Sequence, residues 1–346
     1  MKAFEDGPTQ PDQPADPPRA RPTAEDLELA ILGEDPVFSA QDVAAETGVT
    51  LDEARRLWRA LGFPDRGAEI AFTASDAEAV SILVRQVESG LIDFDLAVTL
   101  TRAVGQTMAK LADWEVATLV HRVQEIESGE HATGSRATAG LRLIEHMNEP
   151  FERLLVYVWR RHLAAAVARV ETLGGELDSD DADLRTVRMT IGFADIVGFT
   201  ELSNELTQTR IGDLVEVFES RCADVVAGQR GRIIKTLGDA VLFVNDDPIR
   251  AYDTAEGIII VVGRDPRMPD VRVGLASGSV VMRLGDVFGP PVNLASRLTG
   301  VARRNRVIVD QATADLLPAD QFETRRLPAR PLRGFGLLEP LAVRRH

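Results

Sequence analysis

Cysteine, lysine and long apolar runs are nearly missing from this chain of 346 residues. Its single cysteine, Cys222, excludes a disulfide within the chain, and we expect a reducing, cytoplasmic setting. No uninterrupted apolar stretch approaches the ~20 residues that cross a bilayer, so no membrane span is expected. The formal charge of −15 makes nucleic acid and anionic membranes poor partners, because both repel an acidic surface.

Composition divides the chain into regions. The first of them is acidic and rich in proline, which predicts a disordered tail and no secretory signal. Next, apolar residues recur at spacings of three and four, which predicts a helical regulatory domain. One amphipathic connecting helix at 150–172 follows, with Pro150 in its first turn, and then an acidic linker. The predicted regions are 1–22, 23–149, 150–184 and 185–346.

After Leu184 the pattern predicts alternating strands and helices. The order β, α, β, β, α, β, β, α, β predicts an α/β sandwich with helices over one face of a sheet. Strands are expected at 186–194, 232–235, 240–244, 271–275, 279–284 and 307–309, and helices at 202–227, 251–262 and 292–303.

A strand that ends at Asp195 gives the first candidate site. The segment FADIVGFT, residues 193–200, places a turn at Gly198 between this strand and a helix. Carboxylates at strand ends suit hard divalent cations, and amides at a helix start suit phosphate. An ordinary surface turn has the same pattern, so this segment alone does not identify a function.

A short hairpin, KTLGD, gives the second candidate site, with Lys235 on one arm and Asp239 at the turn. Only three of the 39 basic residues are lysines, and Lys235 is the only one after residue 110. A compact ammonium where arginine is the rule indicates a specific requirement. Asp195 and Asp239 both close strands of one sheet, and together they could hold two metal ions.

Two further motifs contain polar groups that suit a nucleotide. Asn293 and Arg297 are four residues apart, so they share one face of the predicted helix. An amide beside a guanidinium suits a ribose and a phosphate. Arg333 precedes the pair Gly334 and Gly336 near the end of the chain, a motif that means little by itself.

Together the motifs FADIVGFT, KTLGDA, GDVFGPPVNLASR and LRGFG, in this order and spacing, resemble the class III adenylyl cyclases over about residues 185–344. The first half is similar, more loosely, to the regulatory halves of soluble, pH-responsive actinobacterial cyclases. The resemblance implies an α+β, ferredoxin-like cyclase sandwich that makes cyclic AMP from ATP.

The resemblance also implies roles for individual residues. Asp195, Asp239 and the carbonyl of Ile196 would bind two Mg²⁺ or Mn²⁺ ions per site. Amides from Val197 through Gly198 and Phe199 to Thr200 would meet the phosphates. Lys235 and Asp286 would read the adenine edge, Asn293 would orient the ribose, and Arg297 would stabilise charge on the transferring phosphate. Arg333 stands where the family often has a lysine for the terminal phosphates, which is a departure from the family's pattern.

A homodimer follows from the same resemblance. Lys235 and Asp239 lie on one short turn, whereas ATP separates its base from its metals by roughly 10 Å or more, and each extended residue spans only ~3.4 Å. The family places each site between two chains, and this chain has all the residues. We therefore expect a C₂ homodimer with two equivalent sites.

Three alternatives compete with this interpretation. A guanylyl cyclase would carry a carboxylate and a small residue in place of Lys235 and Asp286. A DNA-binding regulator could use the helix-turn-helix pattern at 39–61, although acidic residues there offset its arginines. A third alternative is a degenerate cyclase fold used only for binding.

The histidines suggest how the enzyme is controlled. Four of the five, His121, His131, His146 and His162, lie between the helical region and the connecting helix. Histidine titrates between pH 5 and 8, so we expect a proton or a small molecule to act as effector through the N-terminal half. His162 falls on the apolar stripe of the connecting helix, where burial would favour its neutral form.

Overall fold

The structure, a computed structural model, describes residues 22–130, 132–174, 186–283 and 285–346. The chain divides into two compact units, Met1–Glu176 and Leu177–His346. Helices form the first unit, and a mixed sheet with helices forms the second, which confirms the predicted fold class. The predicted tail, except Pro22, and the acidic linker lie outside the described residues.

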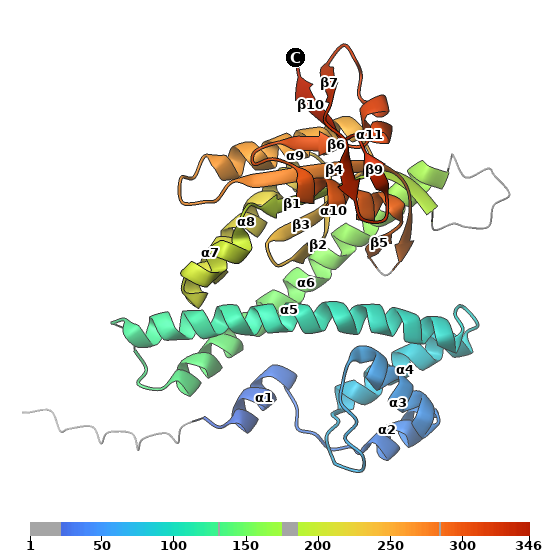
Figure 1. The fold of residues 1–346 in the computed structure, drawn as a ribbon. Helices are drawn as coiled ribbons and strands as arrows, with labels where there is room; N and C mark the ends of the chain where they lie inside the picture. Colours follow the sequence, from blue (N-terminus) through green and yellow to red (C-terminus); the bar gives the residue numbers. More distant parts are fainter. Residues whose placement is uncertain (1–21, 131, 175–185, 284) are drawn as a thin grey trace, which may run out of the picture. The chain divides into compact units, whose positions relative to one another are not determined.

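Capping residues set the helix starts in the first unit. Four of these helices begin with a capping box. The cap side chain accepts a hydrogen bond from the backbone amide three residues later, and the acidic side chain of that later residue accepts one from the backbone amide of the cap. The caps are Thr23, Ser39, Thr50 and Thr73. α2, α3 and α4 gather beside one end of α5 (Figure 1). The helices are α1 (Ala24–Leu32), α2 (Ala40–Thr47), α3 (Leu51–Leu61), α4 (Ala74–Glu88), α5 (Phe94–Ser128) and α6 (Arg136–Gly174). Within the described ranges, none of the helices combines the length and apolar character that crossing a membrane requires.

The connecting helix starts earlier than predicted. α6 begins at Arg136, and Pro150 lies inside it rather than in its first turn. Proline fits a first turn best because it lacks an amide hydrogen, and an interior proline removes one hydrogen bond and crowds the preceding turn at a cost of about 3 kcal/mol or more. α6 packs against α1 and α5, with Ala139 buried.

The second unit is built on one large mixed sheet. Its strand order is β2-β3-β1-β4-β6-β10-β7, with β5 paired to β4, and β8 and β9 form a separate hairpin. The strands are β1 (Thr186–Ile196), β2 (Arg232–Leu237), β3 (Ala240–Asn245), β4 (Val271–Arg283), β5 (Asp286–Phe288), β6 (Val307–Val309), β7 (Phe322–Arg326), β8 (Arg330–Leu332), β9 (Gly336–Leu338) and β10 (Leu341–Arg345). The helices are α7 (Phe199–Glu205), α8 (Gln208–Gly228), α9 (Pro248–Gly263), α10 (Pro290–Val301) and α11 (Gln311–Leu316).

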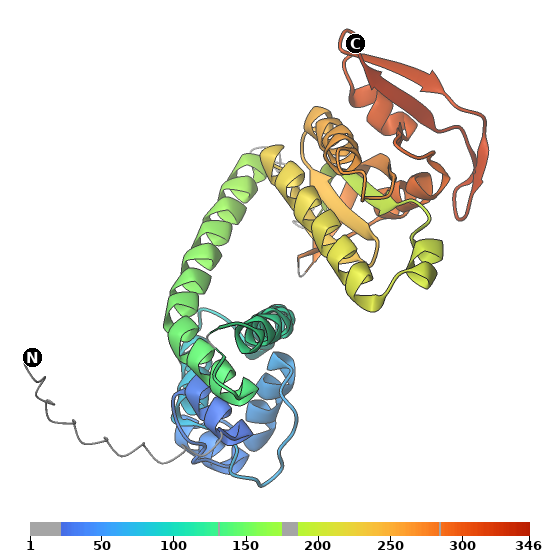
Figure 2. The same cartoon turned by 90° about the vertical axis from the view of Figure 1, so that its left-hand side faces the viewer.

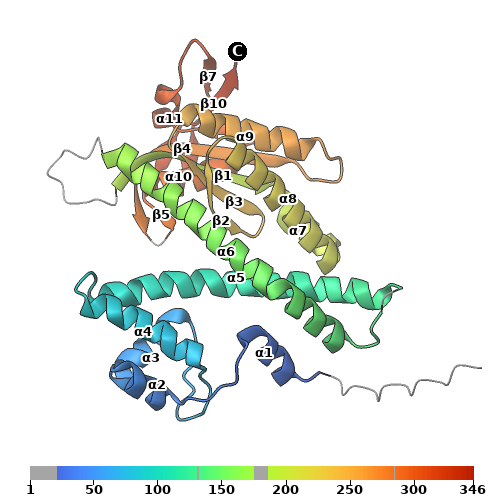
Figure 3. The ribbon, with the colours of Figure 1, turned by 180° about the vertical axis from the view of Figure 1, so that it is seen from behind.

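Helices cover both faces of this sheet, so the prediction of one covered face is wrong. Phe243 of β3 packs with Phe218 of α8 and Ile258 of α9. The preceding residue, Leu242, points the other way and packs with Leu298 of α10. α8 and α9 lie side by side over their face (Figures 2 and 3). A strand that is buried on both faces reads in the sequence as a continuous apolar run. Such a run does not show on which face of the sheet each helix packs.

Several predicted boundaries also change. The helix expected at 202–227 is two helices, because Thr207 starts α8 as its N-cap. The two strands expected at 271–275 and 279–284 are one strand, β4. The elements α11, β5, β7, β8, β9 and β10 were not predicted, because each is short and carries little periodic signal.

Candidate functional site

The two candidate metal ligands lie next to each other at one end of the sheet. Asp195 lies one residue before the end of β1 and pairs in register with Ala240, the residue after Asp239. The amide of Ile196 donates to the carbonyl oxygen of Asp239 at 3.1 Å, which fixes the hairpin turn beside the strand end. The sheet therefore brings together two aspartates that are far apart in the sequence.

Charge and burial act on Asp195 in opposite directions. Burial raises the pKa of its carboxyl group above the ordinary value. A hydrogen bond and the positive charge of Arg272 lower that pKa, whereas the negative charge of Asp239 raises it. A cation bound beside Asp195 would offset the effect of the Asp239 charge.

The donor set fits hard divalent cations that share the substrate's oxygen atoms. Asp195, Asp239 and the Ile196 carbonyl are all oxygen donors, which Mg²⁺ and Mn²⁺ prefer. Among the residues described here, no cluster of three or more His, Cys, Asp or Glu side chains could form a metal cage of its own. Magnesium commonly binds to one or two carboxylates plus substrate phosphates, so two aspartates are sufficient.

The glycine turn after Asp195 leads directly into α7. Gly198 has φ of +74° and caps α7 without a side-chain hydrogen bond, so Phe199 and Thr200 occupy the first positions of the helix. The amide of Val197 donates instead to the carbonyl oxygen of Asp270 at 2.8 Å. The amide of Val197 thus has a backbone partner here, and its contact with phosphate stays a prediction.

Lys235 of β2 and Asp286 of β5 meet, although these two strands pair with β3 and β4 and not with each other. Lys235 Nζ lies 2.5 Å from Asp286 Oδ2, although the two residues are 51 positions apart. The register between β2 and β3 shifts between Ile233 and Lys235, which marks a bulge. A bulge changes the direction of the side chains that follow it, so it sets where Lys235 points.

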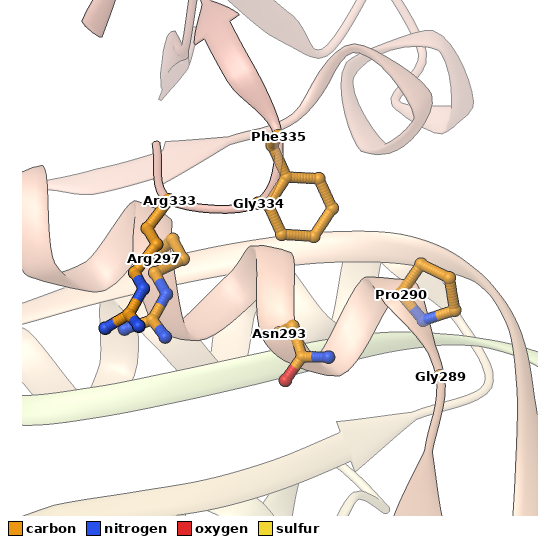
Figure 4. Close-up of a pocket in the computed structure, with 7 residues that line it drawn as sticks. All are labelled: Gly289, Pro290, Asn293, Arg297, Arg333, Gly334 and Phe335. Carbon is orange, nitrogen blue, oxygen red and sulfur yellow. The ribbon is translucent and has the colours of Figure 1, made fainter. Parts of the chain in front are cut away.

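Asn293, Arg297 and Arg333 line one cavity of about 830 Å³ (Figure 4). Asn293 and Arg297 lie on α10, and Arg333 lies at the tip of the β8–β9 hairpin and lines the same cavity. The other lining residues are Gly289, Pro290, Gly334 and Phe335. Two cations and an amide in a cavity of this size suit the phosphate and sugar of a nucleotide.

Gly274 lets α10 lie close to the sheet. A Cβ atom at this position would lie 2.4 Å from the backbone nitrogen of Thr299 and 2.6 Å from the carbonyl oxygen of Ala295. Only glycine fits between β4 and α10 there. The close packing fixes the helix that carries Asn293 and Arg297.

Within one chain the predicted residues form three groups. Asp195 pairs with Asp239, Lys235 pairs with Asp286, and Asn293 joins the two arginines of the cavity. Neither aspartate of the metal pair lines that cavity.

Arg272 was missed by sequence reasoning. It lies directly across from Asp195 in the β1–β4 register, and its Nε donates to Asp195 Oδ2 at 2.7 Å. The available signal was an arginine between the buried residues Val271 and Val273, at the start of a strand. Its partner depends on the strand register, which the sequence does not show.

Comparison with known proteins agrees with this geometry. The family model described as "Adenylate and Guanylate cyclase catalytic domain" matches residues 184–340. A Streptomyces coelicolor protein named "Adenylate cyclase" is 37% identical over 356 residues, covering 95% of this chain and 91% of the relative. One from Streptomyces griseus with the same name is 41% identical over 369 residues, covering 95% and 90%. A Mycobacterium tuberculosis protein named "pH-sensitive adenylate cyclase MT1302" is 31% identical over 340 residues, covering 95% and 84%.

Proposed function

The chain belongs to the adenylate and guanylate cyclase catalytic domain family, and from this premise we propose that it converts ATP to 3′,5′-cyclic AMP and pyrophosphate. The observation that carries the proposal is the contact between Lys235 and Asp286. A lysine ammonium donates to N1 of adenine, and an aspartate accepts from the 6-amino group. Guanine presents the reverse pattern on that edge, so this pair favours ATP over GTP.

The chain's own residues have distinct roles in this mechanism. Asp195, Asp239 and the Ile196 carbonyl would hold two Mg²⁺ or Mn²⁺ ions, which when bound supply Lewis-acid stabilisation of the phosphates and of the ribose 3′-oxygen. Asn293 orients the ribose so that its 3′-oxygen attacks the α-phosphorus in line while pyrophosphate leaves. Arg297 neutralises charge that develops on the transferring phosphate.

Arg333 has the role of binding the leaving pyrophosphate. Arg333 and Arg297 line the same cavity, so both would face the same run of phosphate oxygens (Figure 4). An arginine can replace a lysine here because its planar donors bind phosphate in a bidentate way. We assign no side chain as general base.

We propose that each active site is shared across a C₂ homodimer. The cavity around Asn293 and Arg297 is not lined by Asp195 or Asp239. Within one chain, the metal-binding half and the nucleotide-binding half of the proposed site therefore lie at separate positions. A second copy related by a two-fold axis would bring the metal half of one chain to the nucleotide half of the other, forming two equivalent sites.

We propose that the helical unit regulates the enzyme, with a proton or a small molecule as effector. Within that unit His162 is exposed, so the unit itself does not bury it as the apolar stripe predicted. His121 is also exposed, with Nε2 3.4 Å from Glu125, and His131 lies outside the described residues. Support for a proton comes from the relative that is named pH-sensitive.

The helix-turn-helix predicted at 39–61 is present as α2 and α3, but its cations are engaged within the unit. Arg56 donates to Asp95 at 2.8 Å and stacks over the ring of Phe94. Arg59 donates to the carbonyl oxygen of Arg55. A DNA-binding protein needs a basic face that is free to contact phosphates. These contacts therefore favour a role of the two helices in packing within the unit over a role in DNA binding. Filter binding at low salt tests this, and retention of DNA would support the regulator.

A direct assay tests the activity. Purified full chain with Mg²⁺ or Mn²⁺ should convert ATP to cyclic AMP and leave GTP largely unchanged, measured by mass spectrometry. Asp195→Ala should lower the rate by at least ~100-fold, because one metal loses a ligand. Asp320→Ala, at an exposed position, is the control and should match the wild type. Near-normal activity in Asp195→Ala would exclude the metal assignment.

A further inference from the structure

Asp195 is already paired with a cation of its own chain. Nε and Nη2 of Arg272 lie 2.7 Å and 2.6 Å from Oδ2 of Asp195. Only 17% of the Asp195 side chain and 28% of the Arg272 side chain are exposed, so water screens this pair weakly. Both contacts are charge-assisted and converge on one oxygen, Oδ2, so a metal ion that binds this carboxylate shares it with a guanidinium charge.

The same guanidinium group is also anchored to α10. Nη1 of Arg272 donates to the carbonyl oxygen of Gly300 at 3.2 Å. Gly300 lies in the last turn of α10, where carbonyl groups have no partner within the helix. One side chain therefore spans from the candidate metal carboxylate to the helix that carries Asn293 and Arg297.

The sheet holds Arg272 in this position. Arg272 is the register partner of Asp195 on the neighbouring strand. Val271 and Val273, on either side of it, are fully buried, which prevents the strand from rotating. The close contact of Gly274 with α10 fixes the helix at the distance that the bond to Gly300 requires.

We propose that Arg272 is a positioning residue that competes with a divalent cation for Asp195, and that its displacement by the cation alters the C-terminal turn of α10. This inference rests on the proposed metal role of Asp195. A guanidinium ion and a metal ion compete for the same carboxylate, and their like charges repel each other at short distance. Removing the guanidinium charge therefore makes Asp195 a better ligand in the absence of nucleotide.

The arrangement links two active sites in the proposed homodimer. Asp195 of one chain serves one site, whereas Asn293 and Arg297 of the same chain serve the other. When a metal ion displaces Arg272 from Asp195, the bond from Arg272 to Gly300 changes with it. Metal binding at one site thereby affects the helix that binds nucleotide at the other.

Manganese binding to the full chain without nucleotide tests the competition. Electron paramagnetic resonance measures free Mn²⁺ against wild type and Arg272→Gln. We expect at least ~10-fold tighter binding in the variant, since a neighbouring charge shifts carboxylate affinity by about this factor or more. Arg345→Gln, which breaks an ion pair with Asp253 elsewhere in the unit, is the control and should bind like wild type. Equal or weaker binding by Arg272→Gln would overturn the proposal.

A second variant separates charge from shape. Arg272→Lys keeps the positive charge but cannot reach both Asp195 and Gly300 with one planar group. We expect its Mn²⁺ affinity to stay close to that of wild type. Affinity as tight as in Arg272→Gln would show that charge is not the cause and would contradict the proposal.

Hydrogen exchange tests the link to α10. Addition of Mn²⁺ without nucleotide should speed amide exchange in residues 298–304 of wild type, because Gly300 loses its partner. In Arg272→Lys and Arg272→Gln the same addition should leave that segment unchanged. No response in wild type would exclude the link. Because neither measurement uses ATP, a failure of the proposed cyclase reaction would be seen separately, as absent cyclic AMP.

Discussion

Lys235 and Asp286 hold each other at 2.5 Å across two strands before any nucleotide is bound. Each side chain is partly buried, with 41% of the lysine and 28% of the aspartate exposed. In the proposed function, this donor and this acceptor would meet the adenine edge, which needs one of each. Orienting both groups in advance lowers the cost of binding the base.

Exchanging this pair should change the preferred base. In Lys235→Glu/Asp286→Ser the carboxylate accepts from guanine N1–H and the hydroxyl donates to O6. We expect the ratio of kcat/KM for ATP to that for GTP to fall by at least ~100-fold, since unmatched buried polar groups are costly. The ratio is measured with both nucleotides under identical metal conditions. Lys110→Ala, in the helical unit, is the control. An unchanged ratio would contradict the assignment of these residues to base recognition.

Mixing two inactive variants should restore activity. Asp195→Ala damages the metal half of a site, and Arg297→Ala damages the nucleotide half. A heterodimer of the two has one intact site and one doubly damaged site, so re-associated mixtures should recover up to about a quarter of wild-type activity if subunits pair at random. Light scattering and a tagged subunit establish that exchange has occurred. If subunits exchange and no cyclic AMP forms, the shared-site arrangement is wrong.

Asp310 should make stability depend on pH. It is buried, accepts hydrogen bonds from the amides of Thr313 and Ser277, and burial raises the pKa of its carboxyl group above 3.8. Because the folded pKa lies above the unfolded value, the folded state favours the protonated form, and stability from this group is lost as pH rises through the folded pKa.

The matching substitution is Asp310→Asn, which keeps an acceptor for the cap and removes the charge. Its Tm at pH 7–8 should exceed that of wild type by about 2–4 °C, and the difference should shrink as pH falls toward the raised pKa. Differential scanning fluorimetry across this range measures both proteins. Asp320→Asn is the exposed control, with no comparable trend expected. A lower Tm for Asp310→Asn at neutral pH would show that the charged form is the stabilising one.

The proposed control by protons predicts a change in the pH–activity profile. A histidine titrates between roughly pH 5.5 and 7.5, so activity of the full chain should change steeply in that range. His162→Gln, on the connecting helix α6, should flatten the change, whereas His121→Gln, beside Glu125 on α5, should leave it in place. Initial rates in buffers of constant ionic strength measure the profile. A full-chain profile that stays the same in His162→Gln would remove that residue from the proposal.

Local patterns predicted those features that depend on neighbours in the sequence. The helix-turn-helix around Gly48, the hairpin of Lys235 and Asp239, and the strand ending near Asp195 all appear in the structure. Each has a short signal, such as a capping residue, a glycine turn or an apolar alternation. The length of α6 was not predicted, because Pro150 fits both a first turn and an interior position.

The sequence by itself determined the chemistry: one unpaired cysteine, the motifs around Asp195, Asp239 and Arg297, and an isolated lysine in an arginine-rich chain. Only the tertiary structure decided which of these groups touch. The pairing of Arg272 with Asp195, 77 positions apart, depends on strand register, and a shift by one residue would turn Arg272 to the other face. Contacts of this kind arise from the packing of whole elements, and no local pattern in the sequence encodes them.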